Sequence, residues 1–182
     1  MKELYDKIYS TVRSYDGKIN HKIDLVKTNI AGLISDASII DIGCGKGHYA
    51  RSIKSLGYHN YTALEFSTAC CEEFLKDVPH INADFLEYGP TVPDGQYDLC
   101  LCMDVLEHIS YERIDEFVSN IKRISQKSLL GIANHSDMFL GEEIHLIQEE
   151  ISWWTKLLEK HFDRVHCIHE TPKFFMFVCE NV

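Results

Sequence analysis

The chain has 182 residues, of which 45% are hydrophobic, and this suits one domain with a sizeable core. Its 28 acidic and 18 basic residues give a formal net charge of -10, which opposes attraction to nucleic acid and to anionic membranes. The N-terminus is acidic and mixed, and no apolar run approaches the ~20 residues that span a bilayer, so we expect neither nucleic-acid nor membrane partners.

The first 36 residues show two sets of apolar side chains at helical spacing. Leu4, Ile8 and Val12 form the first set, and a second set runs from Ile19 to Leu33, with Gly17 between them. We predict two N-terminal helices here. They form a helical cap (residues 1–36) ahead of a core (residues 37–182) within a single domain.

From Ser38 onward, short apolar runs alternate with helical patterns. The predicted strands are Ile39–Ile42, Tyr61–Leu64, His80–Ala83, Tyr97–Met103, Ser128–Ala133, Arg164–His169 and Phe174–Cys179. The predicted helices are His48–Leu56, Thr68–Leu75, Glu112–Ile124 and Gln148–His161. This alternation predicts an α/β fold with a seven-stranded, mostly parallel sheet and helices on both faces. The short Thr171–Lys173 connection predicts a C-terminal antiparallel hairpin.

A glycine loop follows the first predicted strand in the segment Asp41-Ile42-Gly43-Cys44-Gly45-Lys46-Gly47. Glycines let the backbone turn sharply and approach a ligand closely, and the N–H groups at the start of the next helix favour an electron-rich partner. The spacing differs from the dinucleotide fingerprint, because the third glycine comes two residues after the second rather than three.

Seven cysteines, an odd number, lie mostly in apolar runs. We expect free thiols, which favours a reducing, cytoplasmic location.

Four segments, in this order, resemble motifs of the class I S-adenosylmethionine-dependent methyltransferases of the small-molecule type. They are Asp41–Gly47, Tyr61–Glu65, Asn82–Phe85 and Gln96–Ile109, which contains Asp104-Val105-Leu106-Glu107-His108. The resemblance covers roughly Ser38 to Val182. It implies a Rossmann-like fold, S-adenosyl-L-methionine as cofactor and S-adenosyl-L-homocysteine as product.

The resemblance also implies cofactor-binding residues at the ends of successive strands. The loop residues Gly43, Cys44, Gly45 and Gly47 would wrap the methionine part, with Asp41 facing its ammonium group. Glu65 would accept hydrogen bonds from the ribose hydroxyls, Asp84 would receive the adenine amino group, and Phe85 would pack on the base.

Each of these residues also has a purely structural interpretation. Asp41 can cap its loop, Cys44 can be a small buried spacer, and Phe85 can belong to the core. Asp104 can cap the following helix or line the methyl-transfer chamber, and both interpretations stay open. Glu107 and His108 are interpreted as packing and hydrogen-bonding parts of that turn.

The acceptor site is expected in the polar stretch from Asn134 to His145, which follows the fifth strand. His145 is the first candidate for a general base and His135 the second, because imidazole titrates near neutral pH. This stretch also contains side chains that can bind a divalent ion, namely His135, Asp137, Glu142, Glu143 and His145, but no tight ligand spacing occurs and no metal is predicted. Of the adjacent Trp153 and Trp154, one is expected in the core, and the other can wall the acceptor pocket or join a partner.

The predicted function is methyl transfer to oxygen or nitrogen of a small polar acceptor. A shorter resemblance, from His145 to the tryptophan-bearing helix, points to a sugar or sugar nucleotide. The alternatives are a non-catalytic binding module with this fold and a protein methyltransferase. The oligomeric state is left open.

Overall fold

The computed structural model describes residues 1–15 and 20–182. Gly17 and Ile19, which figure in the prediction of the N-terminal helices, lie outside these residues. Both predicted helices are present, as α1 (Lys2–Thr11) and α2 (Asn20–Ile30).

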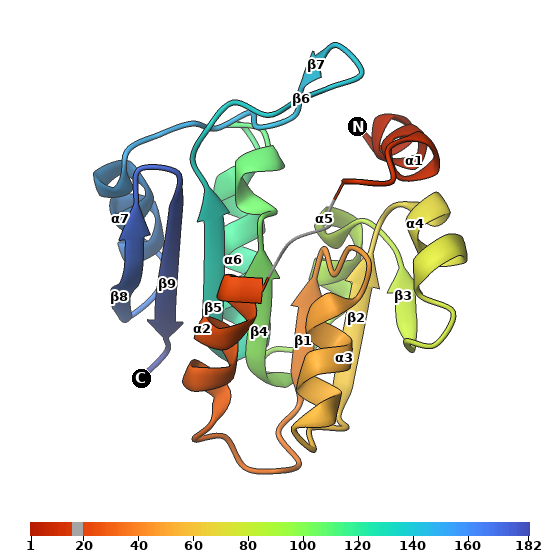
Figure 1. Ribbon diagram of the computed structural model, residues 1–182. Helices are drawn as coiled ribbons and strands as arrows, with labels where there is room; N and C mark the ends of the chain where they lie inside the picture. The colour runs from red at the N-terminus through yellow and green to blue at the C-terminus, as the bar shows by residue number, and fades with distance from the viewer. Residues whose placement is uncertain (16–19) are drawn as a thin grey trace.

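A seven-stranded sheet forms the centre of the fold, in the order β3-β2-β1-β4-β5-β9-β8. Its strands are β1 (Ile39–Ile42), β2 (Tyr61–Glu65), β3 (His80–Asn82), β4 (Tyr97–Met103), β5 (Ser125–Ala133), β8 (Arg164–Thr171) and β9 (Phe174–Glu180). Neighbours among β1 to β5 pair in parallel, while β9 runs antiparallel to both β5 and β8. The predicted fold class is confirmed, including the C-terminal antiparallel pair (Figure 1).

Alternate residues of the strands bury against helices on opposite faces of the sheet. Ile39, Leu101 and Leu129 pack with α2 and α3 (His48–Ser55) on one face. Ile40, Cys102 and Leu130 pack with α6 (Ile114–Ile124) and α7 (Ile151–Glu159) on the other. Two-sided burial explains why these strands read as continuous apolar runs in the sequence.

Several connections differ in detail from the predictions. The helices expected from Glu112 and Gln148 begin later, as α6 and α7, and short elements occur in the connections. These elements are α5 (Phe85–Tyr88), η1 (Gly89–Thr91), η2 (Leu106–His108), β6 (Met138–Phe139) and β7 (Glu142–Glu143). Before α7 the chain stays extended because the Ile147 N–H donates to the Glu107 carbonyl (3.0 Å) and the Ile147 side chain is fully buried.

Helix α1 lies across the carboxyl end of the sheet, beside α4 (Thr68–Phe74) (Figure 1). Asp6 Oδ1 accepts hydrogen bonds from the Ser67 hydroxyl (2.7 Å) and from the Ala69 N–H (3.1 Å). A carboxylate at a helix N-terminus is stabilised by the unpaired N–H groups there. This contact places α1 over the strand ends that carry the predicted site.

The two tryptophans have different environments. Trp154 is fully buried in the core, whereas Trp153 is partly exposed and packs edge-on against Tyr111, with ring centroids 5.8 Å apart. All seven cysteines are free, and only Cys167 is exposed. Among the described residues, no helix combines the length and the apolar character that crossing a membrane requires.

Because only one face of α6 is buried, substitutions on its two faces should differ strongly in their effect on the free energy of unfolding. Ile121 is fully buried against the sheet, so we expect Ile121→Ala to lower the free energy of unfolding by about 2–5 kcal/mol, through lost burial and the cavity left behind. Ser119→Ala, on the exposed face of the same helix, is the control and should change it by less than about 0.5 kcal/mol. Urea denaturation measures both, and equal effects would contradict this packing.

Candidate functional site

The glycine loop after β1 has a backbone that only glycine adopts easily. Gly43 has φ +69°, and a Cβ at this position would lie 2.5 Å from Val105 Cγ2. Gly47 has φ +73° and is the residue immediately before α3. The loop therefore presses its backbone against the turn after β4, with no room for a side chain at Gly43.

Glu65, the last residue of β2, ties two loops together. Its Oε2 accepts the Gly45 N–H (3.0 Å) and its Oε1 accepts the Ser67 N–H (2.9 Å). The side chain is buried, and it lines a cavity at the carboxyl ends of the strands. Each carboxylate oxygen has two lone pairs, so further donors can still be accepted there.

That cavity, the apolar cavity, has a volume of about 280 Å³ and is lined mainly by apolar surface. Its lining includes Leu64, Glu65, Phe66, Ala83, Asp84, Phe85, Val105 and Ile109. Asp84 precedes α5, and its Oδ1 accepts the Leu86 N–H (2.9 Å). Phe85 is buried against Phe117, with ring centroids 4.7 Å apart, so it serves the core and the cavity wall together.

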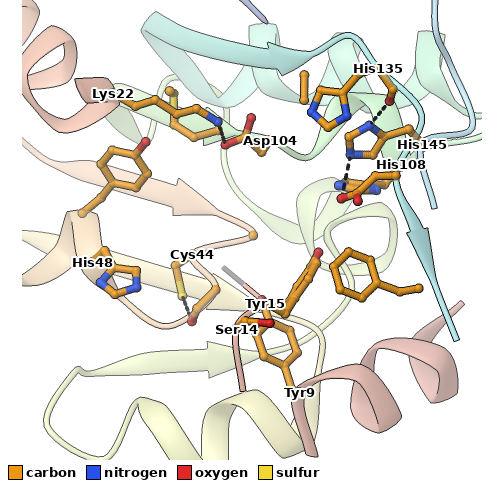
Figure 2. A pocket seen from close by; sticks show the side chains of 17 residues that line it. Tyr9, Ser14, Tyr15, Lys22, Cys44, His48, Asp104, His108, His135 and His145 are labelled. Atoms are coloured by element: carbon orange, nitrogen blue, oxygen red, sulfur yellow. Dashed lines mark hydrogen bonds and ion pairs between the residues drawn. The ribbon is translucent and has the colours of Figure 1, made fainter. Parts of the chain in front are cut away.

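A second cavity, the polar cavity, has a volume of about 270 Å³ (Figure 2). Its lining includes Lys22, Cys44, Gly45, His48, Asp104, His135, Asp137 and His145. Lys22 and Asp104 lie on one side beside the histidines, and Tyr9 and Tyr15 lie across from them. Five residues line both cavities, namely Tyr9, Tyr15, Gly43, Asp104 and His108, so the two are neighbours.

The segment after α1 is held over the glycine loop by Lys46. The Lys46 ammonium donates to the carbonyls of Arg13 (3.1 Å) and Tyr15, and it lies 4.7 Å from the centre of the Phe74 ring. Tyr15 in turn packs edge-on against Phe139, with ring centroids 4.9 Å apart. The N-terminal segment thus covers both cavities.

Asp104 directly follows β4 and has a strained backbone conformation, with φ +57°. Its Oδ2 forms an ion pair with Lys22 (2.5 Å), while its Oδ1 is buried and has no hydrogen-bond partner among the described residues. Val105, rather than Asp104, is the residue before η2, and no side chain caps that turn. This arrangement favours the interpretation that Asp104 lines the chamber.

Three histidines meet at the polar cavity. The ring centroids of His108 and His145 are 4.7 Å apart, and those of His135 and His145 are 4.9 Å apart. Burial, reinforced by the neighbouring His145, lowers the pKa of His108 to about 4, and burial also lowers the pKa of His145. Both rings are therefore neutral at pH 7.

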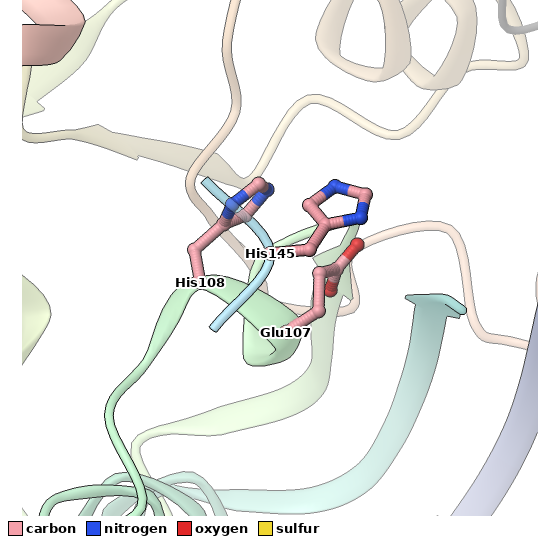
Figure 3. A group of neighbouring side chains, drawn as sticks. All are labelled: Glu107, His108 and His145. Carbon is pink, nitrogen blue, oxygen red and sulfur yellow. The ribbon is translucent and has the colours of Figure 1, made fainter. Parts of the chain in front are cut away.

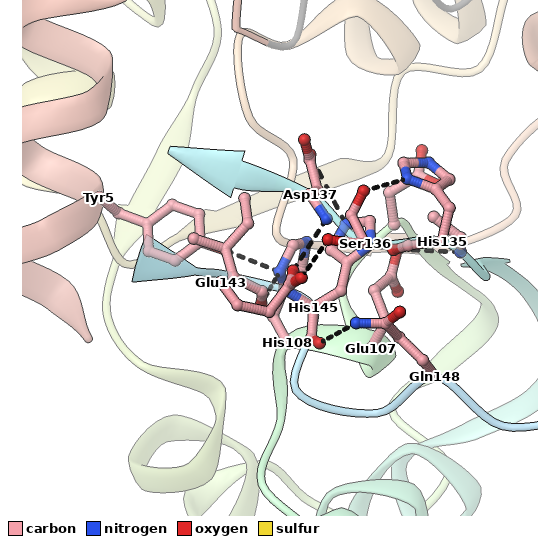
Figure 4. A network of polar contacts seen from close by, with 12 residues as sticks. Tyr5, Glu107, His108, His135, Ser136, Asp137, Glu143, His145 and Gln148 are labelled. Atoms are coloured by element: carbon pink, nitrogen blue, oxygen red, sulfur yellow. Dashed lines mark hydrogen bonds and ion pairs between the residues drawn. The ribbon is translucent and has the colours of Figure 1, made fainter. Parts of the chain in front are cut away.

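Glu143 fixes the loop that carries two of these histidines (Figure 4). Its carboxylate accepts the Ser136 hydroxyl (2.5 Å), the Asp137 N–H (2.8 Å) and the His145 N–H (3.0 Å). The hydrogen bonds from Ser136 and Asp137 lower the pKa of Glu143 to about 2, so it stays ionised. The Glu143 carboxylate thus fixes the shape of the loop, a role that the sequence analysis does not predict.

Glu107 is fully buried beside His108 and His145 (Figure 3). One carboxylate oxygen, Oε1, accepts the Ala133 N–H (2.9 Å), and the other, Oε2, has no partner among the described residues. Burial and the nearby Asp104 raise the pKa of Glu107 well above its usual value. One ligand atom from each of Glu107, His108 and His145 lies within 4.8 Å of the others, so these three side chains could hold a metal ion.

Comparison with known proteins places this geometry in a family. Residues 40–128 match the family model described as a methyltransferase domain. Magnesium protoporphyrin IX methyltransferase from Synechocystis PCC 6803, crystallised with S-adenosylhomocysteine, superposes with a TM-score of 0.74 at 15% identity, covering 100% of both chains. The DhpI complex with S-adenosylhomocysteine gives a TM-score of 0.74 at 16% identity, covering 98% of this chain and 96% of that one.

The match to the methyltransferase domain model thus spans just under half of the chain, and the two superposed structures share its fold. Among curated proteins, the ubiquinone biosynthesis O-methyltransferase of Rickettsia bellii (strain OSU 85-389) is 31% identical over 121 residues, which are 64% of this chain and 49% of the relative. The chain thus spans about half the length of the curated relatives that it matches.

Most of the predicted methyltransferase site residues lie at the two cavities. Gly43, Glu65, Asp84, Phe85 and Asp104 line the apolar cavity, and Gly43, Cys44, Gly45, Asp104, His135 and His145 line the polar one. Asp41 and Gly47 line neither. Asp41 is buried under the loop, where it accepts the Tyr61 hydroxyl, and Gly47 immediately precedes α3.

Sequence reasoning does not select Lys22, His48, Phe66 or His108, all of which line one of the two cavities. Lys22 and His48 lie on helices with ordinary surface patterns, so no local signal marked them. The sequence analysis interprets Glu107 and His108 as packing and hydrogen-bonding residues of a turn, not as residues of the site. Their position directly after a strand end was the available signal.

The dual role of Glu65 in the methyltransferase loop can be tested by amide exchange. Glu65→Gln keeps the shape but turns an NH₂ group toward one of the two backbone donors, so the Gly45 or Ser67 amide should exchange about tenfold faster or more. NMR-detected hydrogen exchange measures this. Glu73→Gln, on the exposed side of α4, is the matched control. Unchanged exchange at both amides in Glu65→Gln would contradict the assignment.

Proposed function

We propose that this chain is an S-adenosylmethionine-dependent methyltransferase that methylates a hydroxyl oxygen of a small polar acceptor. One observation carries the proposal, namely that an apolar cavity and a histidine-lined polar cavity adjoin at Gly43, Asp104 and His108. A methyl donor and an acceptor need neighbouring compartments of this kind, because transfer requires the two reacting atoms in contact.

The apolar cavity and the glycine loop fit the cofactor. The loop can pass close to the cavity because Gly43, which lines it, carries no side chain, and the buried Asp104 Oδ1 lacks a partner among the described residues. Glu65 would hold the ribose hydroxyls, Asp84 the adenine amino group, and the loop from Gly43 to Gly45 together with Asp104 the methionine part. When bound, the cofactor supplies a methyl group on a positively charged sulfur that needs little further activation.

The polar cavity fits an acceptor with hydroxyl groups. Its side chains include donors and acceptors of both charges, as Lys22, Asp104 and Asp137 show, which suits a sugar or sugar nucleotide among small polar acceptors. His135 and His145 are the two candidates to receive the hydroxyl proton. Both line the cavity, and a neutral imidazole accepts a proton readily near pH 7.

The names of the Rickettsia relatives support oxygen as the methylated atom, since they are O-methyltransferases of ubiquinone biosynthesis. Labelled cofactor incubated with separate panels of sugar, sugar-nucleotide and phenolic acceptors tests the acceptor class. Label that appears only in protein would overturn a small-molecule acceptor.

Cofactor binding has a direct test in calorimetry. We expect S-adenosylmethionine and S-adenosylhomocysteine each to bind the folded chain, and Asp84→Asn to bind both about tenfold more weakly. The asparagine can still cap α5, but its NH₂ group meets the donor groups of the adenine.

Glu87→Gln is the matched control, because it changes the same charge at an exposed position of α5 outside both cavities. Absence of binding by well-folded wild-type protein would refute the proposed function.

The lowered pKa of His145 predicts the pH dependence of methyl transfer. The lone pair on its ring is available only in the neutral form, so kcat/KM should be flat from pH 7 to 8 and fall on the acid side, with a midpoint below 6.5. His145→Gln should lower kcat by about 10²–10⁴ and remove this acid limb. Exposed His59→Gln should leave the profile unchanged, and an acid limb that persists in His145→Gln would show that this ring is not the proton acceptor.

A further inference from the structure

We propose that Glu107, His108 and His145 form a binding site for a first-row divalent metal ion at the inner end of the polar cavity. The three side chains come from the turn after β4 and from the end of the loop after β5, and one ligand atom of each lies within 4.8 Å of the others (Figure 3). Ligand atoms that bind one ion at about 2.1 Å lie about 3–4 Å from one another. The three side chains would therefore have to move by about an ångström to bind an ion together.

Both imidazoles are oriented as metal ligands usually are. His108 Nδ1 lies 2.7 Å from the Ile144 carbonyl oxygen, and His145 Nδ1 lies 2.6 Å from the His135 carbonyl oxygen. A carbonyl only accepts, so the His145 contact places the ring proton on Nδ1 and leaves the lone pair on Nε2, and the Ile144 contact favours the same tautomer of His108. Hydrogen bonds of this kind fix the tautomer and orientation of metal-binding histidines.

The Tyr5 hydroxyl also lies 2.7 Å from His108 Nδ1 and competes for that nitrogen. If it donates there, Nε2 keeps the proton and cannot ligate. Binding of an ion selects the alternative, in which Nδ1 donates to Ile144.

Glu107 supplies the second, independent observation. Its side chain is fully buried, and Oε2 has no hydrogen-bond partner among the described residues although Oε1 is satisfied by the Ala133 N–H. An unpartnered carboxylate oxygen in a protein interior is costly unless a charge compensates it. A cation between Oε2 and the two histidines provides that compensation.

The surrounding charges favour a cation. Asp104 and Asp137 line the same cavity, and Asp137 Oδ2 lies 3.8 Å from His145 Nε2. Lys22 is the opposing charge, and it is already paired with Asp104. Two imidazoles and a carboxylate suit Mn²⁺, Fe²⁺, Co²⁺ or Zn²⁺ better than Mg²⁺ or Ca²⁺.

The site deepens the proposed function and rests on it for its role in catalysis. Three protein ligands leave positions open toward the cavity, so an acceptor with two adjacent oxygen atoms, such as a vicinal diol, could bind the ion through both. The ion lowers the pKa of a bound hydroxyl, whose O–H bond then breaks with the electron pair left on oxygen. In the ion-bound form His145 would be a ligand, so of the two candidates His135 would receive the proton.

Metal binding is tested on the full chain without cofactor or acceptor, so that its failure is distinct from failure of cofactor binding. Chelator-treated protein is titrated with MnCl₂, CoCl₂ and ZnCl₂ at pH 7.5 by calorimetry, and Co²⁺ binding is followed by its visible absorption. We expect one ion per chain, and an ion concentration of 100 times Kd should raise Tm by about 5 °C or more.

Glu107→Gln is the informative variant because glutamine keeps an oxygen that accepts the Ala133 N–H. In the presence of chelator it should be at least as stable as wild type at pH 7.5, yet bind the ion at least about tenfold more weakly. His145→Asn should weaken binding similarly. His135→Asn is the matched control, since its carbonyl still accepts from His145, and it should keep metal affinity within about threefold while lowering methyl transfer.

Lack of binding of all three ions by folded wild-type protein would overturn the proposal. So would an affinity of Glu107→Gln equal to that of wild type, or a loss of binding in His135→Asn as large as in His145→Asn.

Discussion

The site depends on one constraint, which is the parallel pairing of β1 with both β2 and β4. Parallel neighbours end at the same edge, so the glycine loop, Glu65 and Asp104 are brought together although 63 residues separate Asp41 from Asp104. In the sheet order, β2 lies on one side of β1 and β4 lies on the other. A crevice forms where the order reverses, and both cavities lie there.

Much of this arrangement could be predicted from sequence, because each part has a local signal. β-Branched and aliphatic runs marked all seven strands, and Gly43 had to be glycine for reasons of backbone conformation and contact with Val105. Glu65 and Asp84 were found because their segments resemble family motifs, and their place at strand ends agrees with that resemblance. The roles of these residues toward a cofactor stay predictions.

The parts that could not be predicted are tertiary. Nothing near Ile147 shows that its N–H will donate to the Glu107 carbonyl, yet this bond delays α7 and brings His145 beside His108. Metal-ligand rules look for short spacings, whereas Glu107 and His145 are far apart in sequence. The cluster weighed from sequence shares only His145 with the one that the fold assembles, and Glu143, another of its members, shapes the loop instead.

The covering of the two cavities by a single N-terminal segment has a kinetic consequence. Tyr9 and Tyr15 line both cavities, and Lys46 fastens this segment to the glycine loop. A displacement of the segment would uncover both cavities at once, and the bonds from Lys46 to the Arg13 and Tyr15 carbonyls would have to break first.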